Sequence, residues 1–111
     1  VSERTVLFAT DSDRLSRSTR RILEGIARDY RKHRNFRIVL GGHTDERGEA
    51  DYNMDLSRRR SLMVARYLGS RGVPRRAIES RYFGETYPEN PQSNQQAWAR
   101  NRRVTVWLAN Q

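Results

Sequence analysis

The chain has 111 residues, which is enough for one domain with one core, so we expect residues 1–111 to form a single domain. It contains no cysteine, which excludes disulfides, thiol nucleophiles and thiolate metal ligands, and its two histidines are too few for a closed structural zinc site. The 22 basic and 13 acidic residues give a formal net charge of +9, which makes polyanions and anionic surfaces candidate partners.

The first half of the chain is typical of a strand, a helix and a second strand. Residues 4–8 form a short apolar run that ends at the polar residues 9–13. From residue 15, side chains at spacings of three and four predict the buried face of a helix, formed by Leu15, Thr19, Ile22, Leu23, Ile26 and Tyr30. Residues 36–40 are β-branched and aromatic, as in a strand, and Gly41 and Gly42 follow them.

The second half repeats this alternation after a polar loop at residues 43–51. A second helix is predicted to end near Gly69, with its core face formed by Leu56, Met63, Val64, Tyr67 and Leu68. Residues 77–82 alternate weakly, as in an edge strand, and a turn-rich loop covers 84–94. A short helix at 95–99 and a strand at 104–108 complete the order β-α-β-α-β-(α)-β. This order predicts an α/β (α+β) two-layer sandwich.

One arginine lies on the apolar face of the second helix. At 100° per residue, Arg60 lies about 40° from Leu56 and about 20° from Tyr67. A guanidinium at the edge of a core needs an anion and several acceptors, so we expect an acidic partner. Asp45 is the candidate, because its loop follows a strand end, where α/β sheets usually place ligands.

Asn53 points about 20° from Arg60 if the helix extends that far. A carboxylate, a guanidinium and an amide that face one site would suit a zwitterion, with Asp45 on its ammonium and Arg60 on its carboxylate. The alternative is that Asp45 and Arg60 pair only with each other and stabilise the loop. Spacing alone does not decide between the two.

These residues fall in motifs that resemble a known family. Residues 42–48 (GHTDERG), 52–60 (YNMDLSRRR) and 101–104 (NRRV) resemble the signature of the OmpA C-terminal-like family, which includes peptidoglycan-associated lipoproteins and the MotB periplasmic domain. The resemblance covers nearly the whole chain. It implies an OmpA-like fold with a mixed sheet, and it implies a binding protein without enzymatic activity or cofactor.

The ligand implied by the resemblance is peptidoglycan, held non-covalently through the diaminopimelate residue of its stem peptide. Asp45 would bind the ammonium and Arg60 the carboxylate of this residue. Asn53 would contact the peptide, and Asp11 and Thr44 would line the pocket.

The resemblance also implies supporting residues around the site. Leu56 would pack under it, and one of Arg102 and Arg103 would support the binding loop. Gly41 departs from the family pattern, because members often carry glutamate at this position. The missing glutamate carboxylate removes one possible hydrogen-bond acceptor near the site.

The implied location is the periplasm. The full-length protein would be associated with the outer membrane, or anchored in the inner membrane, through a part absent from this chain, since no apolar run here approaches the roughly 18 residues of a membrane span. Other envelope proteins are possible partners.

Two other classes of function stay open. The net charge, together with aromatic residues interleaved with arginine, is compatible with a nucleic-acid or other polyanion-binding module, although the spacing of Tyr82, Phe83, Trp98 and Trp107 is more typical of core positions and no nucleic-acid-binding signature accompanies them. The second class is a protein-interaction module, for which the loop 84–97 is the first candidate surface.

His43, Asp45 and Ser57 do not make a credible hydrolase triad, because no G-x-S-x-G turn is present and Ser57 suits a helix start. We expect His43 to make a hydrogen bond that stabilises its loop. No metal site is expected.

Overall fold

The computed structural model describes residues 2–110. These residues form one mixed sheet with the spatial order β1-β4-β2-β3. The strand β4 is antiparallel to both of its neighbours, whereas β2 and β3 are parallel. The strands are β1 (Ser2–Leu7), β2 (Phe36–Gly42), β3 (Ile78–Tyr82) and β4 (Arg103–Asn110).

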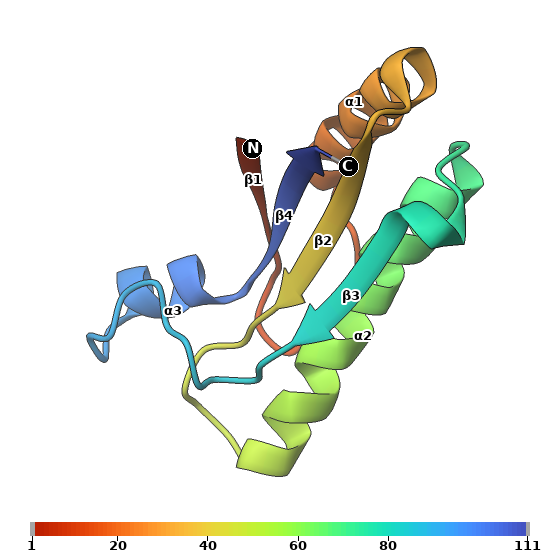
Figure 1. The fold of residues 1–111 in the computed structure, drawn as a ribbon. Coiled ribbons are helices and arrows are strands. Elements are labelled where there is room, and N and C mark those ends of the chain that lie inside the picture. Colours follow the sequence, from red (N-terminus) through yellow and green to blue (C-terminus); the bar gives the residue numbers. More distant parts are fainter. Residues whose placement is uncertain (1, 111) are drawn as a thin grey trace.

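Two long helices cover one face of this sheet, which confirms the two-layer architecture (Figure 1). They are α1 (Arg17–His33) and α2 (Ala50–Ser70), and their apolar faces share one core with Val6, Ile38, Leu40, Val104 and Val106 of the strands. A short 3-10 helix, η1 (Arg75–Ala77), leads into β3, and α3 (Gln95–Asn101) precedes β4. The loops after β2 and β3 gather with α3 at one end of the sheet, away from the two ends of the chain (Figure 1).

The first helix differs from its prediction at two positions. It begins at Arg17, because the Ser16 side chain accepts a hydrogen bond from the Thr19 backbone N–H and caps the helix there, so Leu15 is buried ahead of the helix. Ile22, expected on the core face, is 38% exposed. It lies about 100° from Leu23 on the helix and beside the edge strand β1, where no further strand covers it. Among residues 2–110, no helix is long and apolar enough to cross a membrane.

The face of the sheet away from α1 and α2 carries a second set of side chains. Val104 and Val106 point into the core, so Arg103, Thr105 and Trp107, which alternate with them, lie on the opposite face. The expectation that Phe83 and both tryptophans belong to the core is therefore wrong: Phe83, Trp98 and Trp107 are half-buried outside it, and Tyr82 is 45% exposed.

His43 follows β2 and packs its ring against Phe83, with ring centroids 5.2 Å apart and planes 30° apart. Its backbone N–H donates to the Arg103 carbonyl oxygen at 2.9 Å, but within the described chain its buried Nδ1 has no hydrogen-bond partner. The expected stabilising hydrogen bond thus comes from the backbone of His43 and not from its imidazole. Burial, with a smaller effect of the Arg103 charge, lowers the pKa of His43 from 6.5 to about 4.

Gly42 sits where α2 crosses the sheet. A Cβ atom at this position would collide with the Ser57 carbonyl oxygen of α2 and approach the Ser61 Oγ at 3.0 Å. The helix can approach the sheet this closely only because residue 42 has no side chain.

Gly42→Ala is expected to lower the free energy of unfolding by about 2 kcal/mol or more, because the helix must move away from the sheet. Gly25→Ala is the matched control: a Cβ there meets nothing within 4 Å, so it should raise the free energy of unfolding by about 0.5–1 kcal/mol. Urea denaturation of both variants measures the difference, and equal effects would contradict the close approach at Gly42.

Acidification is expected to destabilise the fold through His43. Between pH 6.5 and pH 4 the unfolded chain binds a proton at this residue and the folded chain does not, so stability is lost as the pH falls through this window, by roughly 3 kcal/mol. His43→Gln should flatten the dependence of unfolding free energy on pH over this range. His33→Gln, at the exposed end of α1, is the matched control, and a His43→Gln slope equal to that of the wild type would contradict the assignment.

Candidate functional site

A cavity of about 200 Å³ opens where three segments meet: the loop after β1, the loop after β2 and the first turns of α2. The six residues predicted to bind or to lie under the ligand all line this cavity, although they come from three separate parts of the sequence. They are Asp11, Thr44, Asp45, Asn53, Leu56 and Arg60.

Arg60 is fully buried at the base of the cavity. Its Nε donates to the Ser12 carbonyl oxygen at 2.8 Å, and its two terminal nitrogens donate to the carbonyl oxygens of His43 at 2.8 Å and Ala9 at 3.1 Å. The expectation of an acidic side chain in direct contact is wrong, because backbone carbonyls of two loops supply the acceptors. Three of the five N–H groups are used in this way, which leaves two for a ligand.

The environment of Arg60 also affects its charge. Burial lowers the pKa of Arg60 to about 10, and the charge of Asp45 opposes this effect. The guanidinium therefore stays protonated at neutral pH, although it forms no direct ion pair with a carboxylate of residues 2–110.

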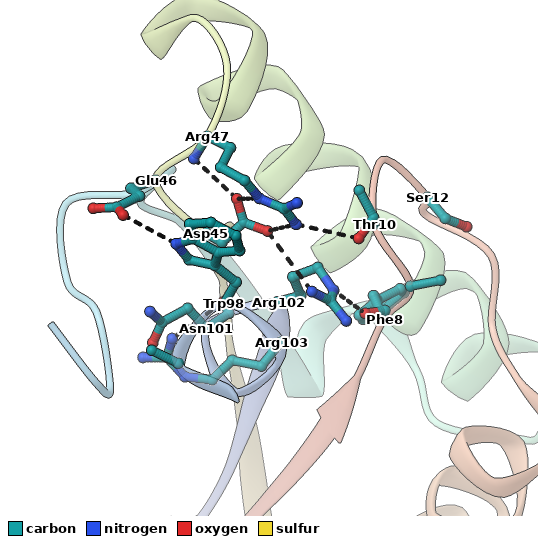
Figure 2. A network of polar contacts seen from close by, with 12 residues as sticks. Phe8, Thr10, Ser12, Asp45, Glu46, Arg47, Trp98, Asn101, Arg102 and Arg103 are labelled. Carbon is teal, nitrogen blue, oxygen red and sulfur yellow. Dashed lines mark hydrogen bonds and ion pairs between the residues drawn. The ribbon is translucent and has the colours of Figure 1, made fainter. Parts of the chain in front are cut away.

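Asp45 pairs with other arginines, so the alternative of a closed Asp45–Arg60 pair does not hold in this structure. Its carboxylate accepts from the backbone N–H, the Nε and a terminal nitrogen of Arg47 at 2.9, 3.2 and 2.9 Å. Figure 2 shows this carboxylate between the guanidinium groups of Arg47 and Arg102, the latter 3.9 Å away. Burial alone would raise the pKa of Asp45, but the hydrogen bonds from Arg47 and the charges of Arg47 and Arg102 outweigh it and lower the pKa below its ordinary value.

Asn53 is buried at the start of α2 and its amide N–H₂ is fully engaged. It donates to the Arg47 carbonyl oxygen at 2.9 Å and to the carboxylate of Glu85 at 2.9 Å. The amide oxygen is thereby left as the group that Asn53 can offer to a ligand. Glu85 was not predicted, because it comes from the loop after β3 and only the fold brings it to Asn53.

The other two predicted lining residues come from different loops. Asp11 has a left-handed backbone with φ of 56°, and its carboxylate accepts a hydrogen bond from the Tyr52 hydroxyl, which joins the loop after β1 to α2. Thr44 is buried, and its Oγ1 has no hydrogen-bond partner within residues 2–110. An unpaired hydroxyl on the wall of a polar cavity is suited to meet a bound ligand.

The two candidate supporting arginines have different partners. Arg102 donates from Nε to the carbonyl oxygen of Phe8, the residue after β1, at 2.8 Å and faces Asp45, so it joins the loop after β1 to the loop after β2 (Figure 2). Arg103 donates to the Tyr87 carbonyl oxygen at 3.0 Å and lies 3.8 Å from Glu89. Arg102 is therefore the one that contacts the site, whereas Arg103 holds a loop on the open face of the sheet.

Trp98 of α3 does not line the cavity, but it contacts Arg47, which does, and this contact was not predicted. The Arg47 guanidinium lies 4.3 Å from the Trp98 ring centroid, and the indole N–H donates to Glu46 at 3.0 Å. These contacts attach α3 to the loop after β2. The lining carries two carboxylates, Asp11 and Asp45, and two guanidinium groups, Arg47 and Arg60, so its charges balance.

Comparison with known proteins agrees with this fold. A model of the OmpA family matches residues 7–102. The peptidoglycan-associated lipoprotein of Pseudomonas putida is 42% identical over 102 residues, which cover 92% of this chain and 61% of that protein. The chain thus spans about three fifths of the length of such relatives.

Solved structures extend the comparison to the backbone. The peptidoglycan-associated lipoprotein from Burkholderia pseudomallei aligns with a TM-score of 0.91 and 30% identity, over 95% of this chain and 89% of that chain. The cell wall anchor of the T6SS from Pseudomonas aeruginosa aligns with a TM-score of 0.82 and 27% identity, over 98% of this chain and 81% of that chain. Because the family model matches most of its length, this chain belongs to the OmpA family.

Proposed function

We propose that this chain binds peptidoglycan non-covalently, through the free end of a diaminopimelate residue in the stem peptide. The observation that carries the proposal is the charge-balanced cavity in which Asp45 and the buried Arg60 face one space with separate sets of partners. A ligand end with both an ammonium and a carboxylate matches the two. Relatives that are named peptidoglycan-associated lipoproteins add support.

The proposed contacts follow from the unused hydrogen-bonding groups. The ligand carboxylate accepts from the two remaining N–H groups of Arg60, in a buried setting where a charge-assisted hydrogen bond is strong. The ligand ammonium donates to Asp45, which shares its carboxylate between Arg47 and the ligand. The Asn53 amide oxygen and the Thr44 hydroxyl provide neutral contacts.

The proposed role is tethering of the cell envelope to the wall, by binding and without turnover. In the full-length protein this places the domain in the periplasm, associated with the outer membrane through a segment outside residues 1–111; an inner-membrane anchor would serve the same role. No cofactor enters the proposal. Envelope proteins are further possible partners, whereas the balanced charge of the cavity does not favour a nucleic acid.

The central test is the loss of binding on substitution of Arg60. Arg60→Ala should weaken binding of a diaminopimelate-containing tripeptide by at least about 100-fold, because it removes a buried charge partner of the ligand carboxylate. Arg58→Ala, two positions earlier on the exposed face of α2, should change the affinity by less than about threefold. Isothermal titration calorimetry measures both, and the lysine-containing tripeptide, which lacks the carboxylate, should not bind.

Equal losses of affinity for Arg60→Ala and Arg58→Ala would indicate a diffuse charge effect and contradict the proposed binding site. Because removal of Arg60 leaves three carbonyls without a donor, thermal unfolding of each variant is measured alongside. Asp45→Asn provides a second variant of nearly the same shape, and its affinity should also fall while its fold is retained.

Salt dependence separates this pocket from a polyanion site. Raising the salt from about 0.05 M to about 0.2 M should weaken tripeptide binding by less than about threefold, because the paired charges are buried and poorly screened. A polyanion held by several surface arginines would lose roughly 1,000-fold over the same range. Affinity for a nucleic acid that exceeds the affinity for the tripeptide at the higher salt concentration would overturn the proposed ligand.

A further inference from the structure

A second cavity, of about 600 Å³, lies on the face of the sheet that α1 and α2 do not cover. We call it the aromatic groove. It is lined by Arg103, Thr105 and Trp107 of β4, by Phe83, Tyr87 and Glu89 of the loop after β3, and by Glu3, His43 and Arg100. None of these residues lines the cavity that contains Asp45 and Arg60.

The rings of His43, Phe83 and Tyr87 form a connected series. Phe83 contacts Tyr87 edge to face with ring centroids 5.2 Å apart, and Tyr87 is 63% exposed. Gly41 of β2 lies next to Phe83 and Trp107: a Cβ there would come within 3.2 Å of Phe83 and 3.3 Å of Trp107, and within 2.8 Å of the Thr105 Oγ1. The absence of a side chain at residue 41 allows the Phe83 and Trp107 rings to pack against the sheet.

The groove also contains polar groups of both charges. The Trp107 indole N–H donates to Glu3 at 3.0 Å, and Glu89 receives two hydrogen bonds from Arg100, at 2.7 and 3.2 Å. His43, which lines the groove, is 4% exposed and its Nδ1 has no partner within the described residues. A buried polar atom without a partner usually belongs to a site that a water or a ligand completes.

We infer that the aromatic groove binds a carbohydrate, namely the N-acetylated glycan strand of the peptidoglycan whose stem peptide is proposed to enter the cavity at Asp45. The inference thus rests on the proposed function. A sugar ring presents C–H groups that pack on the faces of aromatic side chains, and it presents hydroxyl and acetamido groups around its edge. The exposed Tyr87 ring and the half-buried Phe83 and Trp107 rings meet the first kind of group, and the planar polar side chains that line the groove meet the second.

Other occupants match the groove less well. Glu3 and Glu89 balance the charges of Arg100 and Arg103, so the groove offers a polyanion no net attraction. A purely apolar partner would leave the buried His43 nitrogen without a hydrogen bond. The adjacent residues His43 and Thr44 line the groove and the cavity respectively, and each buries a polar atom that has no partner within residues 2–110. One short segment thus links the two sites.

The two tryptophans of the chain report the two sites separately. Trp98 contacts Arg47, which lines the cavity, whereas Trp107 lies in the groove, so their indole N–H signals in a ¹⁵N-correlated NMR spectrum distinguish the sites. We expect a peptide-free glycan tetrasaccharide of alternating N-acetylglucosamine and N-acetylmuramic acid to shift the Trp107 signal and to leave the Trp98 signal in place. The diaminopimelate-containing tripeptide should shift Trp98.

The matched variants are Tyr87→Ala, at an exposed residue that lines the groove, and Tyr82→Ala, an exposed tyrosine that is not among the groove residues. Tyr87→Ala should weaken glycan binding at least about fivefold and leave tripeptide binding unchanged, whereas Tyr82→Ala should change neither. Both side chains are largely exposed, so folding should be retained, and thermal unfolding checks this.

The outcomes for the two sites are distinguishable. Absence of a Trp107 shift at about 10 mM glycan, or a shift that Tyr87→Ala does not weaken, would overturn the groove as a glycan site even if the tripeptide binds. Glycan binding that persists while the tripeptide fails to bind would support the groove and overturn the proposed peptide site.

Discussion

The site depends on one interaction, the contact of the buried Arg60 guanidinium with three backbone carbonyls. Ala9 and Ser12 belong to the loop after β1 and His43 follows β2, so a side chain of α2 fixes two loops that are distant in sequence. A buried charge is tolerated only where acceptors surround it, and each carbonyl left without a donor carries a desolvation cost of about 1–3 kcal/mol. The same guanidinium lines the cavity, so the group that would contact the ligand also maintains the shape of the site.

The separate partners of Asp45 and Arg60 explain why the cavity can stay open. Had the two formed a direct ion pair, each would have neutralised the other and a ligand would have had to break that pair. Instead, Arg47 and Arg102 hold the Asp45 carboxylate, and neutral carbonyls hold Arg60. Opposite charges thereby remain available side by side. Such an arrangement favours a ligand that supplies both charges over one that supplies a single sign.

The sequence predicted much of this arrangement from side-chain periodicity. The unusual position of Arg60 on an apolar helix face and the direction of Asn53 both follow from 100° per residue, and the cavity contains both. The carbonyl partners of Arg60 were not predictable in this way, because every residue has a carbonyl and only the loop conformation decides where it points. Glu85 is likewise 32 residues from Asn53, a contact that no local pattern encodes. Alternation along β4 predicts that Trp107 lies on the opposite face of the sheet from Val104 and Val106. It does not predict that no helix covers this face.

At the end of β2, neighbouring residues face opposite sides of the sheet and contact different parts of the structure. Gly42 faces α2 and lets the helix that carries Arg60 approach the sheet, whereas Gly41 faces the opposite side and lets Phe83 and Trp107 settle there. The alternation continues into the loop, since His43 lines the aromatic groove and Thr44 lines the cavity. A side chain at residue 42 would therefore disturb the packing of α2, whereas a side chain at residue 41 would disturb the packing of Phe83 and Trp107. This is the physical reason why four consecutive residues can contribute to the cavity that contains Asp45 and Arg60 on one side and to the aromatic groove on the other.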